Sequence, residues 1–185
     1  MTPQTEGILL VDAKNACNCL NREAALNNVQ YICLSLSRTL HNCYQAPSRL
    51  FVAGSGELAS REGTTPEDPL SMPFYALATL PLVRHLQEAC PTTRQVWYAD
   101  DSGGVDRLRK LRVWWEVICS VGKRYGYFTN SAKTVLLVRA HLVTLAHELF
   151  EGTGVQIATN GARYLGSAIG DQAFRGSFLA QRSRS

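Results

Sequence analysis

The fold is decided by the stretch Gln95-Val96-Trp97-Tyr98-Ala99-Asp100-Asp101-Ser102-Gly103-Gly104-Val105. Residues 95–99 are rich in β-branched and aromatic side chains, which is typical of a β-strand. Two adjacent aspartates end this run, and residues 102–105 can return as the partner strand. The stretch therefore predicts a β-hairpin with an acidic tip.

A third aspartate ends another apolar run. Residues 8–11 predict a short buried strand, and Asp12 follows it. Neighbouring carboxylates at buried strand ends resist ionising together unless a cation neutralises them. Mg²⁺ prefers carboxylate, water and phosphate oxygens, and two ions about 3.5–4 Å apart support in-line phosphoryl transfer. An isolated Asp-Asp pair, however, is more often an ordinary polar turn.

The remaining elements follow from hydrophobic periodicity and turn residues. Helices are predicted at residues 22–40, 69–89, 106–125 and 141–150. Strands are predicted at residues 49–53, 57–61 and 133–139, and a second hairpin joins residues 155–158 to 163–169 around Asn160-Gly161. Strands interleaved with helices predict an α+β fold, with a mainly antiparallel sheet and helices packed on one face.

Composition bounds the class of protein. The chain has 185 residues and a net charge of +4, which suits one domain and weakly favours a polyanionic partner. Its 6 cysteines show no zinc-ligand spacing, so we interpret them as reduced, buried thiols of an intracellular protein, cytoplasmic or nuclear. We find no signal peptide and no run long enough to span a bilayer, so we expect neither secretion nor a membrane partner.

Five segments, in chain order, resemble the motifs of reverse transcriptases. The first catalytic motif is matched by Val11-Asp12-Ala13-Lys14-Asn15-Ala16-Cys17-Asn18, and the template- and nucleotide-facing motif by Gly63-Thr64-Thr65-Pro66-Glu67-Asp68-Pro69-Leu70-Ser71. The metal-binding tetrapeptide is matched by Tyr98-Ala99-Asp100-Asp101, and the motif that brings a lysine toward the triphosphate by Gly126-Tyr127-Phe128-Thr129-Asn130-Ser131-Ala132-Lys133-Thr134. The hairpin that grips the primer end is matched by Tyr164-Leu165-Gly166. The tetrapeptide has the form common in non-LTR retrotransposons and group II introns. Tyr-Ala-Asp-Asp alone is weak evidence, but five motifs in the family's order are specific. The resemblance covers about residues 8–170 and implies a polymerase palm.

The resemblance implies a role for each matching residue. Asp12 and Asp100 would hold two Mg²⁺ ions, with Mn²⁺ as a possible substitute, and Asp101 would be an auxiliary acid. The backbone carbonyl of Ala13 would be a further metal ligand. Lys133 would be a proton donor or charge partner for the leaving pyrophosphate, although a solvated lysine before a strand is the plain alternative.

Other residues would face the template, primer and nucleotide. Asp68, Pro69 and Ser71 would shape the floor under the templating base, but Asp68 before Pro69 is also a typical helix N-cap. Tyr98 would pack beside the primer terminus, or else be a core aromatic. The basic residues Arg107, Arg109, Lys110 and Arg112 suggest nucleic-acid contact, but a solvated helix face is the plainer interpretation. Trp114 and Trp115 are expected in the core rather than as stacking platforms.

The implied function is RNA-directed DNA synthesis by two-metal nucleotidyl transfer, with an RNA template, a DNA primer and dNTP as partners. The alternative is a catalytically inactive retroelement relic that at most binds nucleic acid. A viral-type RNA-templated RNA polymerase is disfavoured by Tyr-Ala-Asp-Asp and by Asp-Pro-Leu-Ser.

Three departures from the family pattern indicate a fragmentary and partly degenerate copy. Pro66-Glu67 replaces Gln-Gly, which puts a negative charge beside the triphosphate and removes a backbone donor. Cys17 replaces the aromatic that blocks the ribose 2′-hydroxyl, so sugar selectivity is left open. Residues 1–170 are expected to form a palm without fingers, which an upstream segment or a partner chain would supply, and residues 171–185 a short C-terminal tail.

Overall fold

The structure is a computed structural model that describes residues 5–54, 56–65 and 68–182, so the Pro66-Glu67 departure lies outside the described residues. The chain divides into two compact units. The first unit comprises Met1–Asp12, Cys90–Glu116 and Thr129–Ser185, and the second comprises Ala13–Ala89 and Val117–Phe128. Each unit is described by itself.

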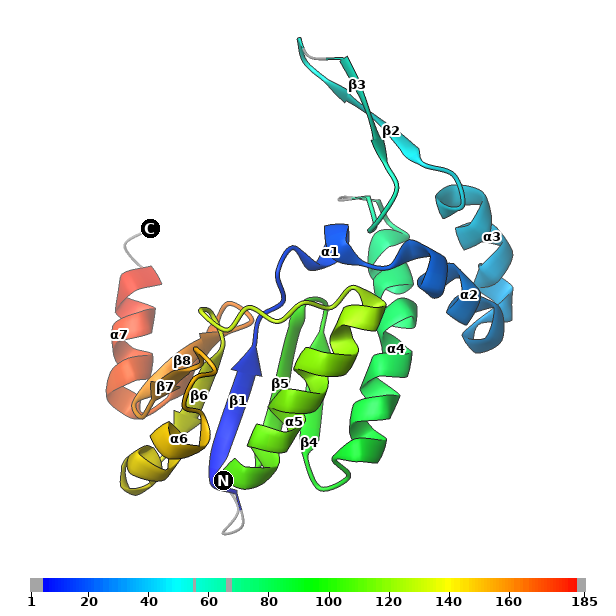
Figure 1. Cartoon of the computed structure of the whole chain (residues 1–185). Helices are drawn as coiled ribbons and strands as arrows, with labels where there is room; N and C mark the ends of the chain where they lie inside the picture. Colours follow the sequence, from blue (N-terminus) through cyan, green and yellow to red (C-terminus); the bar gives the residue numbers. More distant parts are fainter. Residues whose placement is uncertain (1–4, 55, 66–67, 183–185) are drawn as a thin grey trace. The chain divides into compact units, whose positions relative to one another are not determined.

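A five-stranded sheet forms the centre of the first unit (Figure 1). Its strands, in spatial order, are β4 (Arg94–Tyr98), β5 (Asp101–Asp106), β1 (Gly7–Val11), β6 (Val135–Val138) and β7 (Gln156–Ala158). The pairs β4–β5, β5–β1 and β1–β6 are antiparallel, and only β6–β7 is parallel. The predicted α+β fold with a mainly antiparallel sheet is therefore confirmed.

Helices cover one face of this sheet. The helix α5 (Leu108–Val121) packs there through its apolar stripe, and a Cβ added at Gly104 would lie 3.3 Å from the Trp114 ring. Trp114 and Trp115 are buried, as predicted. The short helices η2 (Ala140–Leu142) and α6 (Val143–Leu149) follow β6.

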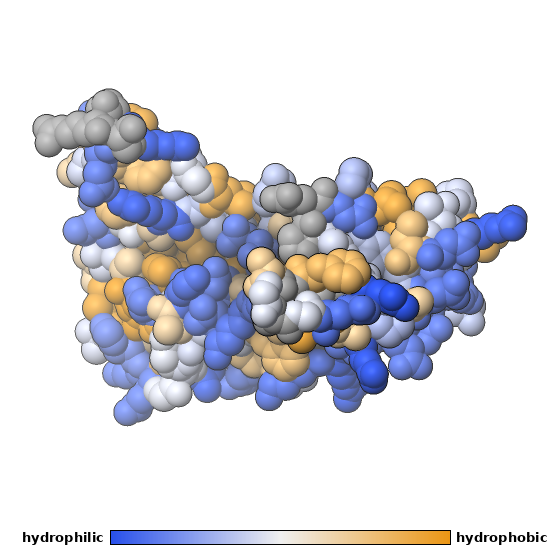
Figure 2. Space-filling view, turned by 90° about the horizontal axis from the view of Figure 1, so that it is seen from above, coloured by the Kyte–Doolittle hydropathy of each residue, from blue (hydrophilic) through white to orange (hydrophobic). Residues whose placement is uncertain are grey.

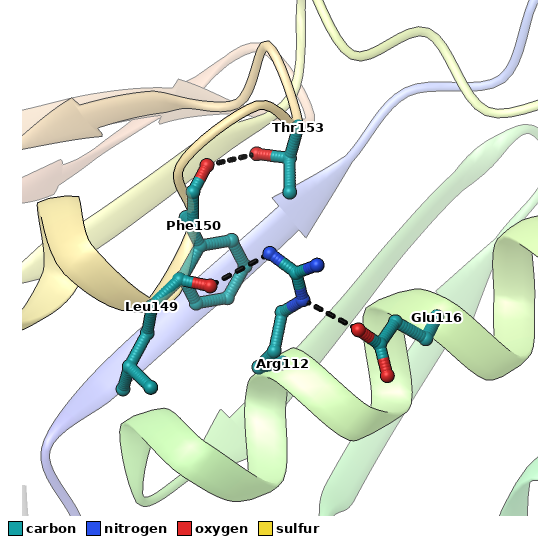
Figure 3. Close-up of polar contacts among 5 residues, drawn as sticks. All are labelled: Arg112, Glu116, Leu149, Phe150 and Thr153. Atoms are coloured by element: carbon teal, nitrogen blue, oxygen red, sulfur yellow. Dashed lines mark hydrogen bonds and ion pairs between the residues drawn. The ribbon is translucent and has the colours of Figure 1, made fainter.

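One arginine ties α5 to the end of α6. In Figure 3, the Arg112 guanidinium lies between the two helices: Nε donates to Glu116 at 2.8 Å, and Nη1 donates to the Leu149 carbonyl at 2.7 Å. The same guanidinium lies 6.0 Å from the centre of the Phe150 ring. Arg112 is thus a structural member of the basic cluster, not a free cation.

The second predicted hairpin was wrong. Residues 155–158 do not pair with 163–169, because β7 adds to the sheet beside β6 instead. The observed hairpin joins β8 (Gly161–Tyr164) to β9 (Ser167–Gly170). Its turn is Leu165-Gly166, with φ of 49° and 68°. Two left-handed residues match the twist of a tight hairpin, so this pair forms the turn in place of Asn160-Gly161.

Leu165 is strained in this turn, since a left-handed conformation costs an ordinary residue roughly 1–2 kcal/mol whereas asparagine tolerates it. We expect Leu165→Asn to be more stable than Leu165→Ala by about 0.5–1 kcal/mol, because the short polar side chain of asparagine can hydrogen-bond locally in the left-handed conformation and that of alanine cannot. Urea unfolding of the two variants measures the difference. Equal midpoints would show that the turn relaxes without strain.

The helix α7 (Gln172–Arg182) lies in the segment that the sequence suggested was only a tail. It begins beside the hairpin: Asp171 Oδ1 accepts a hydrogen bond from the Phe174 amide at 2.7 Å. A Cβ at Gly161 would lie 2.4 Å from the Phe174 ring, so only glycine lets this ring approach β8 so closely.

The second unit is mainly helical. It contains α1 (Ala16–Cys19), α2 (Arg22–Ile32), α3 (Leu34–Tyr44), α4 (Ser71–Ala89), η1 (Gly122–Tyr125) and a separate hairpin of β2 (Ser48–Val52) and β3 (Gly56–Ser60). The predicted hairpin at residues 49–61 and the helix at 69–89 are confirmed. The predicted helix 22–40 is two helices, because Cys33 has an extended backbone and its carbonyl accepts hydrogen bonds from Leu36 and Ser37.

All six cysteines are free, as predicted, but their expected burial was wrong. Only Cys90 is buried, Cys43 is exposed, and the other four are intermediate. In the part of the chain that the structure describes, no helix is long and apolar enough to cross a membrane. Figure 2 shows hydrophobic and hydrophilic residues interspersed on the face seen from above.

Candidate metal centre at the end of the sheet

Strand register brings two of the three predicted acids to the same place in the first unit. β1 and β5 pair with Val11 opposite Ser102, so the next pair along this ladder is Asp12 and Asp101. Directly opposite residues have Cβ atoms about 4.5–5.5 Å apart. Asp101 also pairs with Tyr98 across β4–β5, and Asp100 lies in the turn between those strands.

Both carboxylates project from the face of the sheet that faces away from α5. Gly103 marks this face: a Cβ added there would lie 3.5 Å from the Tyr164 hydroxyl and 3.6 Å from Leu10 Cδ2. Side chains alternate along a strand. Asp101 therefore shares the face of Gly103, and Asp12 shares the face of Leu10.

Asp101 lies in an environment that disfavours its ionised form. Burial raises the pKa of Asp101 above its ordinary value, and the negative charges of Asp100 and Asp12 raise it further. Burial and the two neighbouring negative charges therefore oppose ionisation of the Asp101 carboxyl group. A bound cation would remove this penalty.

We expect Asp101→Asn to stabilise the fold at neutral pH when no divalent cation is present. Because the folded-state pKa is raised, the penalty exists above that pKa and disappears as the pH falls through it. The gain should therefore shrink on acidification. Urea midpoints at neutral and acidic pH measure it, with the exposed Glu151→Gln as the control. A destabilised Asp101→Asn would indicate that Asp101 makes a structural contact instead.

A residue that sequence reasoning missed holds Asp12 in place. The Asn130 side chain donates from Nδ2 to Asp12 Oδ2 at 3.1 Å, and the Asn130 amide donates to the Asp12 carbonyl at 2.8 Å. These two bonds fix both the backbone and one carboxylate oxygen of Asp12. Asn130 belongs to the motif at residues 126–134, which was the available signal, but that motif directed attention to its lysine.

Tyr164 lies near the same acids. Its hydroxyl oxygen is buried and has no hydrogen-bond partner within the described part of the chain. Burial raises the pKa of Tyr164, and the charge of Asp101 raises it further. An unsatisfied buried hydroxyl costs about 1–3 kcal/mol, so a donor is kept beside Asp101 at some expense to stability.

This donor set fits a hard divalent cation, although it is not a complete protein cage. Across the described residues, no group of three or more His, Cys, Asp or Glu side chains is arranged to hold a metal. Burial, and then the negative charges of Asp100 and Asp12, nevertheless raise the pKa of Asp101. Mg²⁺ in nucleotide sites is usually held by one or two carboxylates together with water and substrate phosphates. The residues present therefore suit an ion that arrives with its substrate.

Tyr98 and Lys133 are exposed. Tyr98 is 63% exposed, so the interpretation of this residue as a core aromatic was wrong. It lies on the same face as Asp101, its cross-strand partner. The Lys133 amide donates to the Asn130 carbonyl at 3.1 Å, which places Lys133 in the turn that holds Asp12. No described contact joins its ammonium group to the acids.

In the second unit, the predicted template-facing residues serve the fold. Asp68 Oδ1 accepts a hydrogen bond from the Leu70 amide at 2.9 Å, and Oδ2 accepts one from the Tyr44 hydroxyl. The N-cap interpretation of Asp68 is thus confirmed. Burial raises the pKa of Tyr44, and its bond to Asp68 raises it further. The Ser71 hydroxyl is buried and donates to Thr64 at 2.8 Å, whereas Pro69 is exposed.

Cys17 and Ala13 belong to the segment that follows Asp12. The Cys17 carbonyl accepts a hydrogen bond from the Thr64 amide at 2.6 Å, and the Cys17 side chain is half-buried. Gly63 has a φ of 74°, and a Cβ there would lie 2.3 Å from the Cys17 carbonyl oxygen. The first and second motifs of the sequence are therefore in direct backbone contact. The Ala13 side chain is buried.

Comparison with known proteins identifies the fold. No family model and no curated protein matches the sequence. Among solved structures, apo telomerase from Candida tropicalis is similar at 16% identity with a TM-score of 0.66, covering 91% of this chain and 32% of that one. A form of the same telomerase truncated from its C-terminal domain gives 16% identity, a TM-score of 0.64, and coverage of 94% and 35%.

A third similar structure is telomerase from Candida albicans in complex with a fragment of telomeric RNA. It gives 14% identity, a TM-score of 0.60, and coverage of 93% of this chain and 31% of that one. Telomerase is a reverse-transcriptase-related enzyme, so the chain has a reverse-transcriptase-like fold. The chain spans about a third of the length of these telomerases.

Proposed function

We propose that the chain is the palm of an RNA-directed DNA polymerase that uses two-metal nucleotidyl transfer, with motifs of the non-LTR retrotransposon and group II intron type. The observation that carries the proposal is the meeting of Asp12 and Asp101 at one end of the sheet, beside Asp100, within a reverse-transcriptase-like fold. Its partners would be an RNA template, a DNA primer and dNTP. One similar telomerase is bound to RNA, which supports a nucleic-acid partner.

The chain's own residues would divide the work. Asp12, Asp100 and Asp101, with the Ala13 carbonyl, would hold Mg²⁺ or Mn²⁺, which activates the primer hydroxyl and stabilises the leaving oxygen. Asn130 fixes the orientation of the Asp12 carboxylate through its side-chain amide.

Residues around the acids would act on the substrates. Tyr98 offers an exposed aromatic ring beside Asp101 for the primer end. Lys133, in the turn with Asn130, would donate a proton to the departing pyrophosphate or pair with its negative charge. Asp68, Pro69 and Ser71 would support the templating base, and Cys17 would face the nucleotide sugar.

A second candidate is an inactive relic that at most binds nucleic acid. The sequence departures at Cys17 and Pro66-Glu67 favour it.

Mn²⁺ binding tests the proposal without requiring catalysis. We expect the wild-type chain to bind Mn²⁺, followed by electron paramagnetic resonance of the free ion, and Asp100→Asn to lose at least about tenfold in affinity because a charged ligand is removed. The matched control Glu148→Gln removes an exposed acid on α6 and should bind as the wild type does. Equal binding by the wild type and Asp100→Asn would refute the metal assignment and favour the relic.

A further inference from the structure

A cavity lies at the end of the sheet opposite the acids, also within the first unit. Its lining residues are Thr5, Thr92, Arg94, Val105, Asp106, Arg107 and Lys110. Arg94 begins β4 and pairs with Val105 near the end of β5, whereas Asp101 begins β5. The length of β5 separates this cavity from the acids by about 17 Å, at roughly 3.4 Å per residue.

Asp106, the acid among the described lining residues, accepts hydrogen bonds from its neighbours. Asp106 Oδ2 accepts hydrogen bonds from the hydroxyls of Thr92 at 2.8 Å and Thr93 at 3.1 Å. Its Oδ1 accepts one from the Arg107 amide at 2.7 Å. Asp106 therefore accepts hydrogen bonds from one backbone amide and two hydroxyl groups, and it forms no ion pair with a cation among the described residues.

The cations of the lining are unneutralised. None of Arg94, Arg107 and Lys110 forms an ion pair within the residues that the structure describes, where the ion pairs are Arg49–Glu57 and Arg112–Glu116. Arg112, drawn in Figure 3, shows the contrast: it is held by Glu116 and the Leu149 carbonyl. The structure thus separates one structural arginine from three available cations.

The position of these cations is unfavourable for the helix. The first turn of α5 contains no acidic residue and carries Arg109 and Lys110, with Arg107 directly before it. Cations at a helix N-terminus face the positive end of the helix dipole. Two carboxylates partly offset this cost, because Glu6 Oε2 accepts a hydrogen bond from the Leu108 amide at 3.0 Å and Asp106 Oδ1 accepts one from the Arg107 amide. Neither carboxylate forms an ion pair with the three cations in the part of the chain that the structure describes.

We propose that Arg94, Arg107 and Lys110 form a binding surface for the phosphate backbone of single-stranded nucleic acid, separate from the acidic end of the sheet. Three cations converge on one cavity: Arg94 from β4, Arg107 from the link between β5 and α5, and Lys110 from α5. The hydroxyl groups of Thr5 and Thr92 and the Asp106 carboxylate also line it. Val105 is its only apolar lining residue among those described, so the surface lacks the apolar side chains that insertion into a membrane requires. The inference goes beyond the proposed function, since it needs neither metal nor catalysis.

Fluorescence anisotropy with a labelled single-stranded RNA of roughly 20 nucleotides tests the surface, across a range of salt concentrations. The test variant is Arg94→Gln/Arg107→Gln/Lys110→Gln. The matched control is Arg38→Gln/Arg84→Gln/Arg139→Gln, which removes the same charge from exposed residues elsewhere. We expect the test variant to bind at least about tenfold more weakly, with a salt slope lower by about 2, since each lost phosphate contact removes about 0.7 from the slope. The control should stay within about threefold of the wild type.

Three outcomes would overturn the proposal: equal losses in both triple variants, unchanged binding in the test variant, or a loss seen with anionic phosphatidylserine vesicles but not with RNA. The test variant should keep the Mn²⁺ affinity of the wild type, since none of its three residues belongs to the candidate metal site, so failure of the metal assignment and failure of this surface are distinguishable. Circular dichroism checks folding. If the triple variant is unfolded, Lys110→Gln alone, at an exposed helix position, should lower the salt slope by about 0.7.

Discussion

Replacing Gly126 with alanine should destabilise the chain by about 3 kcal/mol or more, the largest stability loss we expect from adding a single methyl group. Gly126 has a φ of 77°, and a Cβ there would lie 1.9 Å from the Cys19 carbonyl oxygen and 2.6 Å from the Asn21 amide nitrogen. Backbone atoms cannot rotate away as a side chain can. The segment after η1 would have to separate from the segment between α1 and α2, which breaks the bond from the Asn21 amide to the Tyr125 carbonyl.

Gly54 provides the control, because it has the same φ of 77° but no heavy atom within 4 Å of an added Cβ. Gly54→Ala should cost only about 1 kcal/mol, the price of the left-handed backbone alone. Both glycines lie in the second unit, so the free energies of unfolding of the two variants can be compared directly by urea unfolding monitored by circular dichroism. Similar losses in the two variants would show that the contact at Gly126 relaxes easily.

Local sequence patterns predicted correctly the elements whose residue propensity and hydrophobic periodicity match the way they pack in the fold. The hairpin at residues 95–105 has β-rich strands and a polar tip, and the stripe of Leu108, Leu111 and Trp115 faces the sheet in α5. The pattern failed where a long-range partner decides. Residues 156–158 pair with β6, and residue propensity does not predict which strand is the partner. Asn160-Gly161 is more typical of a hairpin turn than Leu165-Gly166, which is the turn in the structure.

The acids of the candidate site could be predicted because Asp12 follows the end of one strand and Asp100 and Asp101 lie at the tip of a hairpin, and these positions meet when the strands pair. The residues that support them could not. Asn130 reaches Asp12 across 118 residues of sequence, and Tyr164 comes from a hairpin whose register was predicted wrongly. Asp68 shows the opposite case, in which a residue assigned to the template by resemblance also caps a helix.

Primer extension should be barely detectable for the unmodified chain and should rise at least about tenfold in the double variant Pro66→Gln/Glu67→Gly. The reason is electrostatic: the resemblance implies that Glu67 would lie beside the triphosphate, where a carboxylate would oppose binding, and a difference of 1.4 kcal/mol is already tenfold. Proline also removes a backbone donor at this position. The assay uses an RNA template, a DNA primer and Mn²⁺.

Asp100→Asn in the repaired background is the blank, and it should lower extension by about 100-fold or more, because it removes charge that would hold the metal at the developing negative charge. The two substitutions act on different steps, nucleotide placement and metal binding, so neither can imitate the other. Robust synthesis by the unmodified chain would mean that Pro66 and Glu67 are harmless. If the repaired chain binds Mn²⁺ through Asp100 yet makes no DNA, the acids persist as a metal site without catalysis, and the relic is the better description of this chain.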